Sequence, residues 1–281
     1  MAPARESSDR MMPSLRPAAL AFDAIAPSFD ERFGPWRSVD AQRRAVRGAL
    51  LRVFPGGGHI LEVGGGTGED ASFLAQRGFE LLLTDPSPAM VARANTKLEP
   101  LGGRAEVAAG EDLEDFAARY LSTGGTMFDG AFSNFAPLNC VVDLEPVARG
   151  LATLLKPGAK AMLVLFGTFC PGEMVVETLR GRPHLALRRC KRGSVPARLA
   201  KRDFQVVYHR RRAIQRAFAP WFELEMRLGI GVTVPPSAAE PWISQQPRLL
   251  AAMEEADRRL ARPLAMFGDH VLYQFRRTGA L

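Results

Sequence analysis

Residues 59–88, HILEVGGGTGEDASFLAQRGFELLLTDPSP, decide the fold, because four glycines fall among residues 64–68 directly after an apolar run. Glycine inside a helix or strand costs roughly 0.5–1 kcal/mol relative to alanine. Such a cluster is therefore expected where the backbone turns tightly or where a ligand approaches it closely. The stretch predicts a strand, a glycine turn, a helix and a second strand.

The same alternation continues along the chain. We predict strands at 59–63, 80–84, 104–109, 127–134 and 159–166, and helices at 37–54, 69–77, 87–98, 112–120 and 141–155, the last ending at a Lys-Pro-Gly turn. Strands separated by helices predict a parallel sheet covered on both faces. After residue 166 we predict a basic insert with a short strand at 204–209 and a helix at 211–218. Strands at 221–230 and 269–278, with a helix at 247–260 between them, suggest an antiparallel addition at the sheet edge.

The glycines allow two interpretations. Ligands of an open parallel sheet lie beyond the carboxyl ends of the strands, and an acid, Asp85, ends the second strand where a ribose-binding carboxylate is expected. The GxGxxA spacing from Gly66 fits the dinucleotide pattern, which would indicate an NAD-binding oxidoreductase. The ExGxGxG spacing from Glu62 fits the pattern that binds S-adenosylmethionine (SAM).

Several motifs in order resemble one family. ILEVGGGTGEDASFLAQRG, LLLTDPSPAMVARA, AGEDLEDF, FDGAFSNFAPLN and LATLLKPGAKAMLVLF resemble successive motifs of class I SAM-dependent methyltransferases, of the small-molecule group related to the ubiquinone-biosynthesis enzymes. FDAIAPSFDERFGP resembles that family's N-terminal lid. The resemblance covers residues 22–166. In the C-terminal third of the chain, only the position of the expected elements is similar, without matching motifs. It implies a Rossmann-like, mostly parallel sheet of seven strands whose last strand is antiparallel.

The resemblance also implies a set of cofactor contacts. Glu62 and the glycine backbone would meet the methionine amine and the sugar, and Asp85 would accept hydrogen bonds from the ribose diol. Glu111 or Asp112 would accept from the adenine amino group. The complete predicted set is Glu62, Gly64, Gly66, Gly68, Asp85, Pro86, Met90, Glu111, Asp112, Ser133 and Asn134.

The acceptor side is less defined. Phe22, Phe29, Phe135 and Phe169 are candidates for lining it, with a packed core as the competing interpretation. Methyl transfer needs a base when the acceptor is a hydroxyl. His209 is the first candidate, and His184, His270 and Tyr208 are others. We expect no metal site.

Composition limits the remaining possibilities. The chain has 281 residues, 47% of them hydrophobic, and no apolar run of signal-peptide or membrane-spanning length. Three widely spaced cysteines favour a reducing compartment, and we expect the cytoplasm. The net charge of +7 is concentrated in residues 180–216, which hold thirteen Lys and Arg and one acid. That segment could be a solvated face, a clamp for an anionic or carrier-tethered substrate, or a nucleic-acid or membrane surface; the absence of an RNA-binding motif disfavours nucleic acid.

These observations predict five segments: a disordered leader (1–13), an N-terminal helical lid (14–54), a SAM-binding core (55–167), a basic insert capping the substrate (168–220) and C-terminal elements completing the sheet (221–281). The predicted function is methyl transfer from SAM to an oxygen or nitrogen of a small organic acceptor. An NAD-binding oxidoreductase and a SAM-binding module without catalysis are the alternatives.

Overall fold

A computed structural model describes residues 16–279, so the predicted leader lies outside the described residues. A seven-stranded sheet has the order β3-β2-β1-β4-β5-β9-β8. Its strands are β1 (Gly58–Val63), β2 (Phe79–Asp85), β3 (Arg104–Val107), β4 (Phe128–Ser133), β5 (Leu155–Phe166), β8 (Phe222–Ile230) and β9 (His270–Arg277). The first five pair in parallel, whereas β9 runs antiparallel to both β5 and β8. The predicted mostly parallel sheet with an antiparallel last strand is confirmed.

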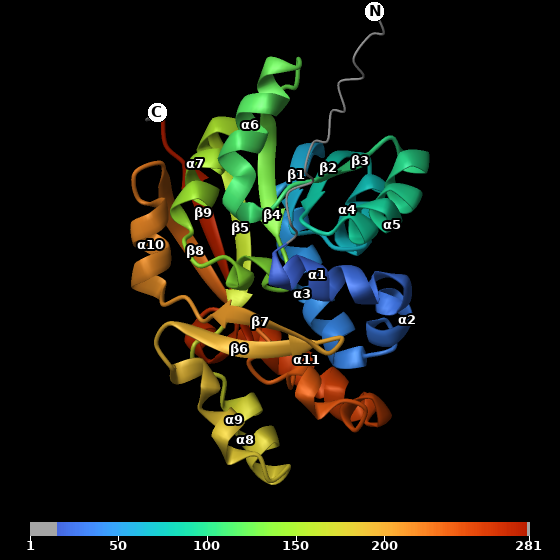
Figure 1. The fold of residues 1–281 in the computed structure, drawn as a ribbon. Coiled ribbons are helices and arrows are strands. Elements are labelled where there is room, and N and C mark those ends of the chain that lie inside the picture. Colours follow the sequence, from blue (N-terminus) through green and yellow to red (C-terminus); the bar gives the residue numbers. More distant parts are fainter. Residues whose placement is uncertain (1–15, 280–281) are drawn as a thin grey trace, which may run out of the picture.

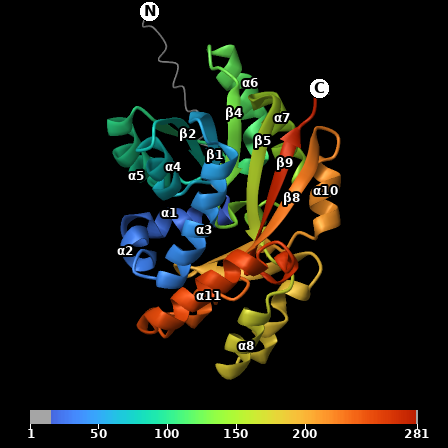
Figure 2. The same cartoon turned by 180° about the vertical axis from the view of Figure 1, so that it is seen from behind.

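Helices cover both faces of this sheet, as predicted (Figure 1). The helices are α1 (Pro17–Ile25), α2 (Phe29–Phe33), α3 (Arg37–Val53), α4 (Glu69–Ala75), α5 (Pro88–Leu98), α6 (Leu113–Ser122), α7 (Glu145–Leu154), α8 (Pro171–Leu179), α9 (Pro183–Ala186), α10 (Arg211–Phe218) and α11 (Pro247–Leu260). One core packs α6, α7 and α10 on one face, through residues such as Phe116, Leu151 and Phe218. A second core packs α3, α4 and α5 on the other, through Leu50 and Leu74 among others (Figure 2).

The carboxyl ends of β1, β2, β4 and β5 meet at one end of the molecule, the lower end in Figure 1. The N-terminal helices, the insert after β5 and α11 gather at that same end (Figures 1 and 2). An open parallel sheet binds its ligand there. The additions to the core therefore surround the expected site and leave the opposite end of the sheet bare.

The predicted Lys-Pro-Gly turn before the fifth strand is wrong, since β5 begins at Leu155 and includes Lys156 and Gly158. Its pairing with β4 shifts between Phe128 and Gly130, which marks a bulge. Gly158 has a φ of 81°, which a side chain would disfavour. The glycine thus serves a kink within one strand: residues 128–130 of β4 face residues 155–160 of β5, so β5 takes up three extra residues there without ending.

The insert after β5 contains more structure than the sequence indicated. Its predicted strand and helix are β7 (Arg202–Val207) and α10, but α8, α9 and β6 (Ser194–Leu199) were not predicted. β6 and β7 form an antiparallel hairpin apart from the main sheet. The inner side of this hairpin packs Phe204, Val206 and Tyr208 against Ala21 of α1. The hairpin and the N-terminal helix therefore close over the same end of the sheet.

Candidate functional site

The glycine turn after β1 has a shape that side chains would prevent. Gly64, Gly66 and Gly68 have φ angles of 72°, 56° and 78°. A Cβ at Gly64 would lie 2.4 Å from Pro137, so the loop after β4 excludes a side chain there. A Cβ at Gly66 would meet no atom within 4 Å among the described residues. The turn is thus packed on one side and open on the other, as a backbone that receives a ligand should be.

Asp85 at the end of β2 faces this turn. Its Oδ2 accepts a hydrogen bond from the backbone N–H of Gly66 at 2.9 Å, and its Oδ1 accepts from that of Ser87 at 2.9 Å. Burial raises the pKa of Asp85 to about 6, although both N–H groups oppose the shift. Each oxygen still has a lone pair to accept from a hydroxyl. The carboxylate is therefore oriented for a vicinal diol before any ligand arrives.

Two further polar groups beside the turn have no partner among the residues described. Glu62 Oε2 and Ser133 Oγ are buried and make no hydrogen bond there. Burial raises the pKa of Glu62 well above its ordinary value, and the neighbouring charge of Asp70 adds to this. Buried polar atoms are normally paired. An ammonium group would satisfy Glu62 and a polar ligand atom would satisfy Ser133, so both fit the methionyl end of SAM.

The end of β4 has an unusual backbone. Phe135 and Ala136 have φ angles of 58° and 63°, in the left-handed region that residues with a Cβ rarely adopt. The Asn134 side chain fixes this shape, because its Oδ1 accepts from the Phe135 N–H at 2.8 Å and its Nδ2 donates to Asp70 at 2.8 Å. Strained backbone of this kind concentrates at ligand sites. The two strained residues lie just past the end of β4, and the Arg43 guanidinium lies 4.7 Å from the centroid of the Phe135 ring.

The N-terminal segment 16–36 is fastened to three parts of the core. Asp23 accepts from the Ser87 hydroxyl at 2.8 Å and from the Ala89 N–H at 2.9 Å. Asp30 accepts from the Thr67 hydroxyl at 2.6 Å and from Lys97 at 2.9 Å. Ile25 and Ala26 pack on the predicted adenine neighbour Met90, which is 1% exposed. The segment covers the side of the glycine turn where Asp85 lies, and Pro86 sits half-buried beside it.

The acidic pair predicted to contact adenine has another partner. Arg16 donates to both carboxylate oxygens of Asp112 at 2.7 Å, and its Nε lies 3.6 Å from Glu111. This bidentate pair lowers the pKa of Asp112. Asp112 is thereby engaged in holding the N-terminal segment, which leaves Glu111 as the freer acceptor. Arg16 carried no motif or spacing that could have singled it out in the sequence, and Asp23 belongs to the lid motif without having been assigned a role.

The four predicted acceptor residues lie toward the carboxyl end of the sheet, but not in one cluster. Phe22 packs against Phe29 and Phe204, with ring centroids 6.5 and 6.0 Å apart. Phe135 is 5.8 Å from the ring of His270. Phe169, three residues after β5, is 37% exposed and packs on Phe267, in the loop before β9.

His209, the first candidate for a base, lies between β7 and α10 rather than in a helix. Its Nε2 donates to the carbonyl of Val141 at 2.9 Å, and the residue is 7% exposed. This bond joins the insert to the loop after β4. A ring nitrogen that carries a proton toward a carbonyl cannot accept one, so Nε2 of His209 is not free to act as a base in this geometry.

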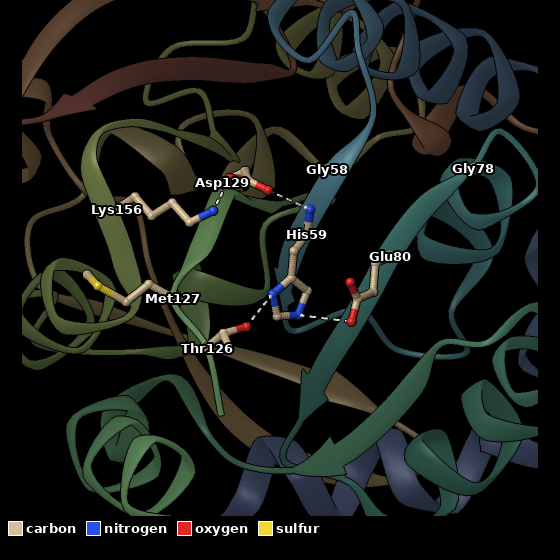
Figure 3. A pocket seen from close by; sticks show the side chains of 8 residues that line it. All are labelled: Gly58, His59, Gly78, Glu80, Thr126, Met127, Asp129 and Lys156. Atoms are coloured by element: carbon tan, nitrogen blue, oxygen red, sulfur yellow. Dashed lines mark hydrogen bonds and ion pairs between the residues drawn. The ribbon is translucent and has the colours of Figure 1, made fainter. Parts of the chain in front are cut away.

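A hollow of about 560 Å³ lies at the edge of the sheet opposite the expected site (Figure 3). Its residues come from the amino ends of β1, β2, β4 and β5. Asp129 accepts from Lys156 at 2.6 Å and from the His59 N–H at 2.9 Å. These polar groups satisfy one another, so the hollow offers no unpaired group to a ligand.

The topology separates the two classes of nucleotide-binding protein that the glycines allowed. A dinucleotide-binding sheet has its strands in the order 3-2-1-4-5-6, and the strands at that far edge are parallel to the rest. Here the antiparallel β9 is inserted between β5 and β8. Three features together define the class I SAM-dependent methyltransferase fold: this sheet, the glycine turn after β1, and the two acids beside the turn, Glu62 of β1 and Asp85 of β2.

Comparisons with known proteins agree. Residues 60–158 match the family model described as a methyltransferase domain. Solved structures of similar fold include the CcbJ methyltransferase from Streptomyces caelestis (16% identity, 92% of this chain and 98% of that chain, TM-score 0.57) and the DhpI complex with S-adenosylhomocysteine (18%, 94% and 96%, 0.52). Another is described as a SAM-dependent methyltransferase from Listeria monocytogenes (15%, 85% and 99%, 0.55). No curated protein matches the chain significantly.

Residues 60–158 are a methyltransferase domain, and the fold around them is that of the class I SAM-dependent methyltransferases, whose cofactor is SAM. This match favours a methyltransferase over the oxidoreductase. Among residues 16–279, no helix combines the length and apolar character that crossing a membrane requires.

The fastening of the N-terminal segment can be tested through Asp30. Asp30→Asn removes a charged acceptor shared by Thr67 and Lys97. We expect the free energy of opening this segment to fall by about 1 kcal/mol, and tryptic cleavage within residues 16–36 to quicken about fivefold. Asp40→Asn is the control, since Asp40 is exposed and pairs with Arg44. Equal cleavage rates for D30N and D40N would contradict the fastening.

Proposed function

We propose that this methyltransferase transfers the methyl group of SAM to an oxygen or nitrogen of a small organic acceptor bound at the carboxyl ends of β4 and β5. The observation that carries the proposal is Asp85, a buried carboxylate aimed by Gly66 and Ser87 at the open side of the glycine turn. Of the predicted cofactor set, Glu62, Gly64, Gly66 and Gly68 belong to the end of β1 and the turn after it, and Ser133 and Asn134 to the end of the neighbouring β4. Met90 packs under Ile25 and Ala26, and Glu111 lies beside Arg16.

The proposed division of labour follows from these positions. Bound SAM supplies an activated methyl group on a sulfonium. Asp85 would hold the ribose, and Glu62 would attract the ammonium of the methionyl end. Asn134 keeps the backbone of Phe135 fixed where acceptor and methyl group would meet. Much of the rate of such an in-line displacement can come from positioning.

The acceptor side favours a small, largely apolar molecule. Phe22, Phe166 and Tyr208 pack in one cluster with the β6–β7 hairpin. A clamp for an anionic substrate is less favoured than the sequence suggested, because Arg188 and Arg189 are both bound to Glu173. The thiols of Cys140, Cys170 and Cys190 are free. We propose, on that ground, that the enzyme works in the cytoplasm.

The pH dependence of SAM binding tests the role of Asp85. Ribose hydroxyls donate to an ionised carboxylate, and burial places the pKa of Asp85 at about 6. SAM affinity should therefore be full above pH 7 and should weaken as the pH falls through 6, by about tenfold at pH 5. In Asp85→Asn the affinity should be low, and the loss of affinity centred near pH 6 should disappear, so that only the dependence due to Glu62 remains. Calorimetry from pH 5 to 8 measures both, and a D85N profile identical to that of the wild type would refute the assignment.

A further inference from the structure

Helix α8 is oriented opposite to an ordinary surface helix. Its two acids, Glu173 and Glu177, are buried, whereas Val175 and Leu179 on its other face are 58% and 82% exposed. A surface helix normally turns its apolar residues toward the core and its charged residues toward water. Both the buried acids and the exposed apolar side chains therefore require an explanation.

The buried acids are paired with arginines of the same insert. Arg188 and Arg189 donate to the two carboxylate oxygens of Glu173 at 2.8 and 2.9 Å. Arg182 donates to Glu177 at 3.1 Å. Buried acids of this kind are stable only when they are paired. The pairs hold the helix with its apolar face outward, so that exposure is a fixed property of the fold.

The exposed charges of residues 171–193, which we call the α8–α9 tip, are all basic. The acids of this segment are the buried pair of α8. Arg180, Lys191 and Arg192 are exposed, and none of them forms an ion pair with a carboxylate of residues 16–279. Leu187, just after α9, is a further exposed apolar residue. The tip thus presents apolar side chains and unpaired cations to solvent.

The tip projects from the end of the molecule that holds the proposed cofactor site. α8 packs against α9 and forms the lower extremity in both views, beyond the β6–β7 hairpin (Figures 1 and 2). The carboxyl ends of the parallel strands lie above it at the same end (Figure 1). The described chain therefore leaves the tip free to meet a broad surface.

We propose that the α8–α9 tip docks on a bilayer that contains anionic phospholipids. Val175 and Leu179 enter the boundary between headgroups and acyl chains, and Arg180, Lys191 and Arg192 meet lipid phosphates. Peripheral proteins bind membranes through this combination of buried apolar area and attraction to anionic lipids. The inference goes beyond the proposed function.

The apolar side chains favour a bilayer over other anionic partners. A nucleic acid attracts cations through its phosphates, but its charged backbone offers no apolar region for a leucine. An acidic protein needs a groove that matches the projecting side chains, whereas a fluid bilayer accommodates them without one.

Docking also has a consequence for the acceptor, and this part rests on the proposed function. A small, largely apolar acceptor dissolves in a bilayer. The tip brings the carboxyl end of the sheet toward that bilayer, so the acceptor would be concentrated beside the site. The cytoplasmic leaflet carries anionic lipids, which agrees with the proposed compartment.

Sedimentation of the full-length protein with sucrose-loaded vesicles tests the docking. We expect binding to vesicles of equal parts phosphatidylcholine and phosphatidylglycerol, and much weaker binding to phosphatidylcholine alone. Leu179→Ser should weaken binding about tenfold, because it removes an apolar side chain from the boundary. Lys191→Gln combined with Arg192→Gln should weaken it by about fivefold for each charge removed.

Matched variants outside the tip are the controls. Val175→Ser removes an exposed valine within the tip, and Val142→Ser removes one that is 71% exposed in the loop between β4 and α7. Only the first should weaken vesicle binding. Arg211→Gln combined with Arg212→Gln lowers the net charge as much as the double variant of the tip, but on α10, and should retain most of the binding.

Two results would overturn the inference: no binding of the wild type to the anionic vesicles, or equal binding by V175S and V142S. Binding to polyglutamate or RNA that equals vesicle binding and is unchanged in L179S would also overturn it, in favour of an anionic polymer. SAM affinity, measured by calorimetry without vesicles, should be the same in every variant. A failure of docking would thus leave the proposed function standing, so the two failures are distinguishable.

Discussion

Replacing Arg189 by methionine is expected to lower the free energy of unfolding by about 3–5 kcal/mol. The substitution removes the guanidinium shared by Glu173 and Asp269, which are 2% and 4% exposed. Both carboxylates would then be buried with too little countercharge, since only Arg188 remains beside Glu173. Urea unfolding followed by circular dichroism measures the change.

Arg198→Met is the matched control for this variant. Arg198 pairs with Asp203 on the hairpin, but both side chains are largely exposed, at 68% and 76%. Its loss should cost less than about 0.5 kcal/mol. Adding Glu173→Gln and Asp269→Asn to Arg189→Met should restore part of the loss. Equal stability of R189M and R198M would show that the buried network contributes nothing specific.

Replacing Asp85 by alanine is expected to weaken SAM binding by about 1–3 kcal/mol, or roughly fivefold to 150-fold. The variant loses the acceptor proposed for the ribose diol and also frees the N–H of Gly66. Because burial of this carboxylate is costly, the fold itself should tolerate the change.

Asp129→Ala is the control for Asp85→Ala. Asp129 also accepts a hydrogen bond from a backbone N–H and also belongs to a strand of the sheet, but it lies at the opposite edge (Figure 3). Its removal should leave SAM affinity unchanged. If D129A weakens SAM binding as much as D85A, the cofactor is not held at the carboxyl end of the sheet.

The core of the fold could be predicted because local signals agreed with one another. Apolar runs, glycine turns and the Ser87 N-cap, whose hydroxyl accepts from the Met90 N–H at 3.1 Å, all belong to short stretches of chain. The exception is β5, where a Pro-Gly pair suggested a turn and instead lies in a kinked part of the strand that takes up three extra residues. Its pairing with β4 on one side and β9 on the other holds the strand together across the kink.

The surroundings of the site could not be predicted in the same way. The partners of Arg16 and Asp23 lie more than sixty residues away in the chain, and no local pattern marks such pairs. The β6 strand was missed because Pro196 and the basic residues on either side of it hide the alternation of apolar and polar residues that marks a strand. Packing of the hairpin on α1 outweighs this weak local signal. The sequence favoured His209 over His270 as a base, although neither residue lies in a motif that shows what its ring contacts. Only the fold shows that one ring bonds a carbonyl while the other faces a carboxylate.

The central claim is that the glycine turn and Asp85 bind SAM. Calorimetry of the purified protein with SAM, S-adenosylhomocysteine and NAD tests it most directly. We predict micromolar binding of the first two and no heat with NAD. Binding of NAD without binding of SAM would mean that the dinucleotide spacing from Gly66 is the one used, and it would contradict the account.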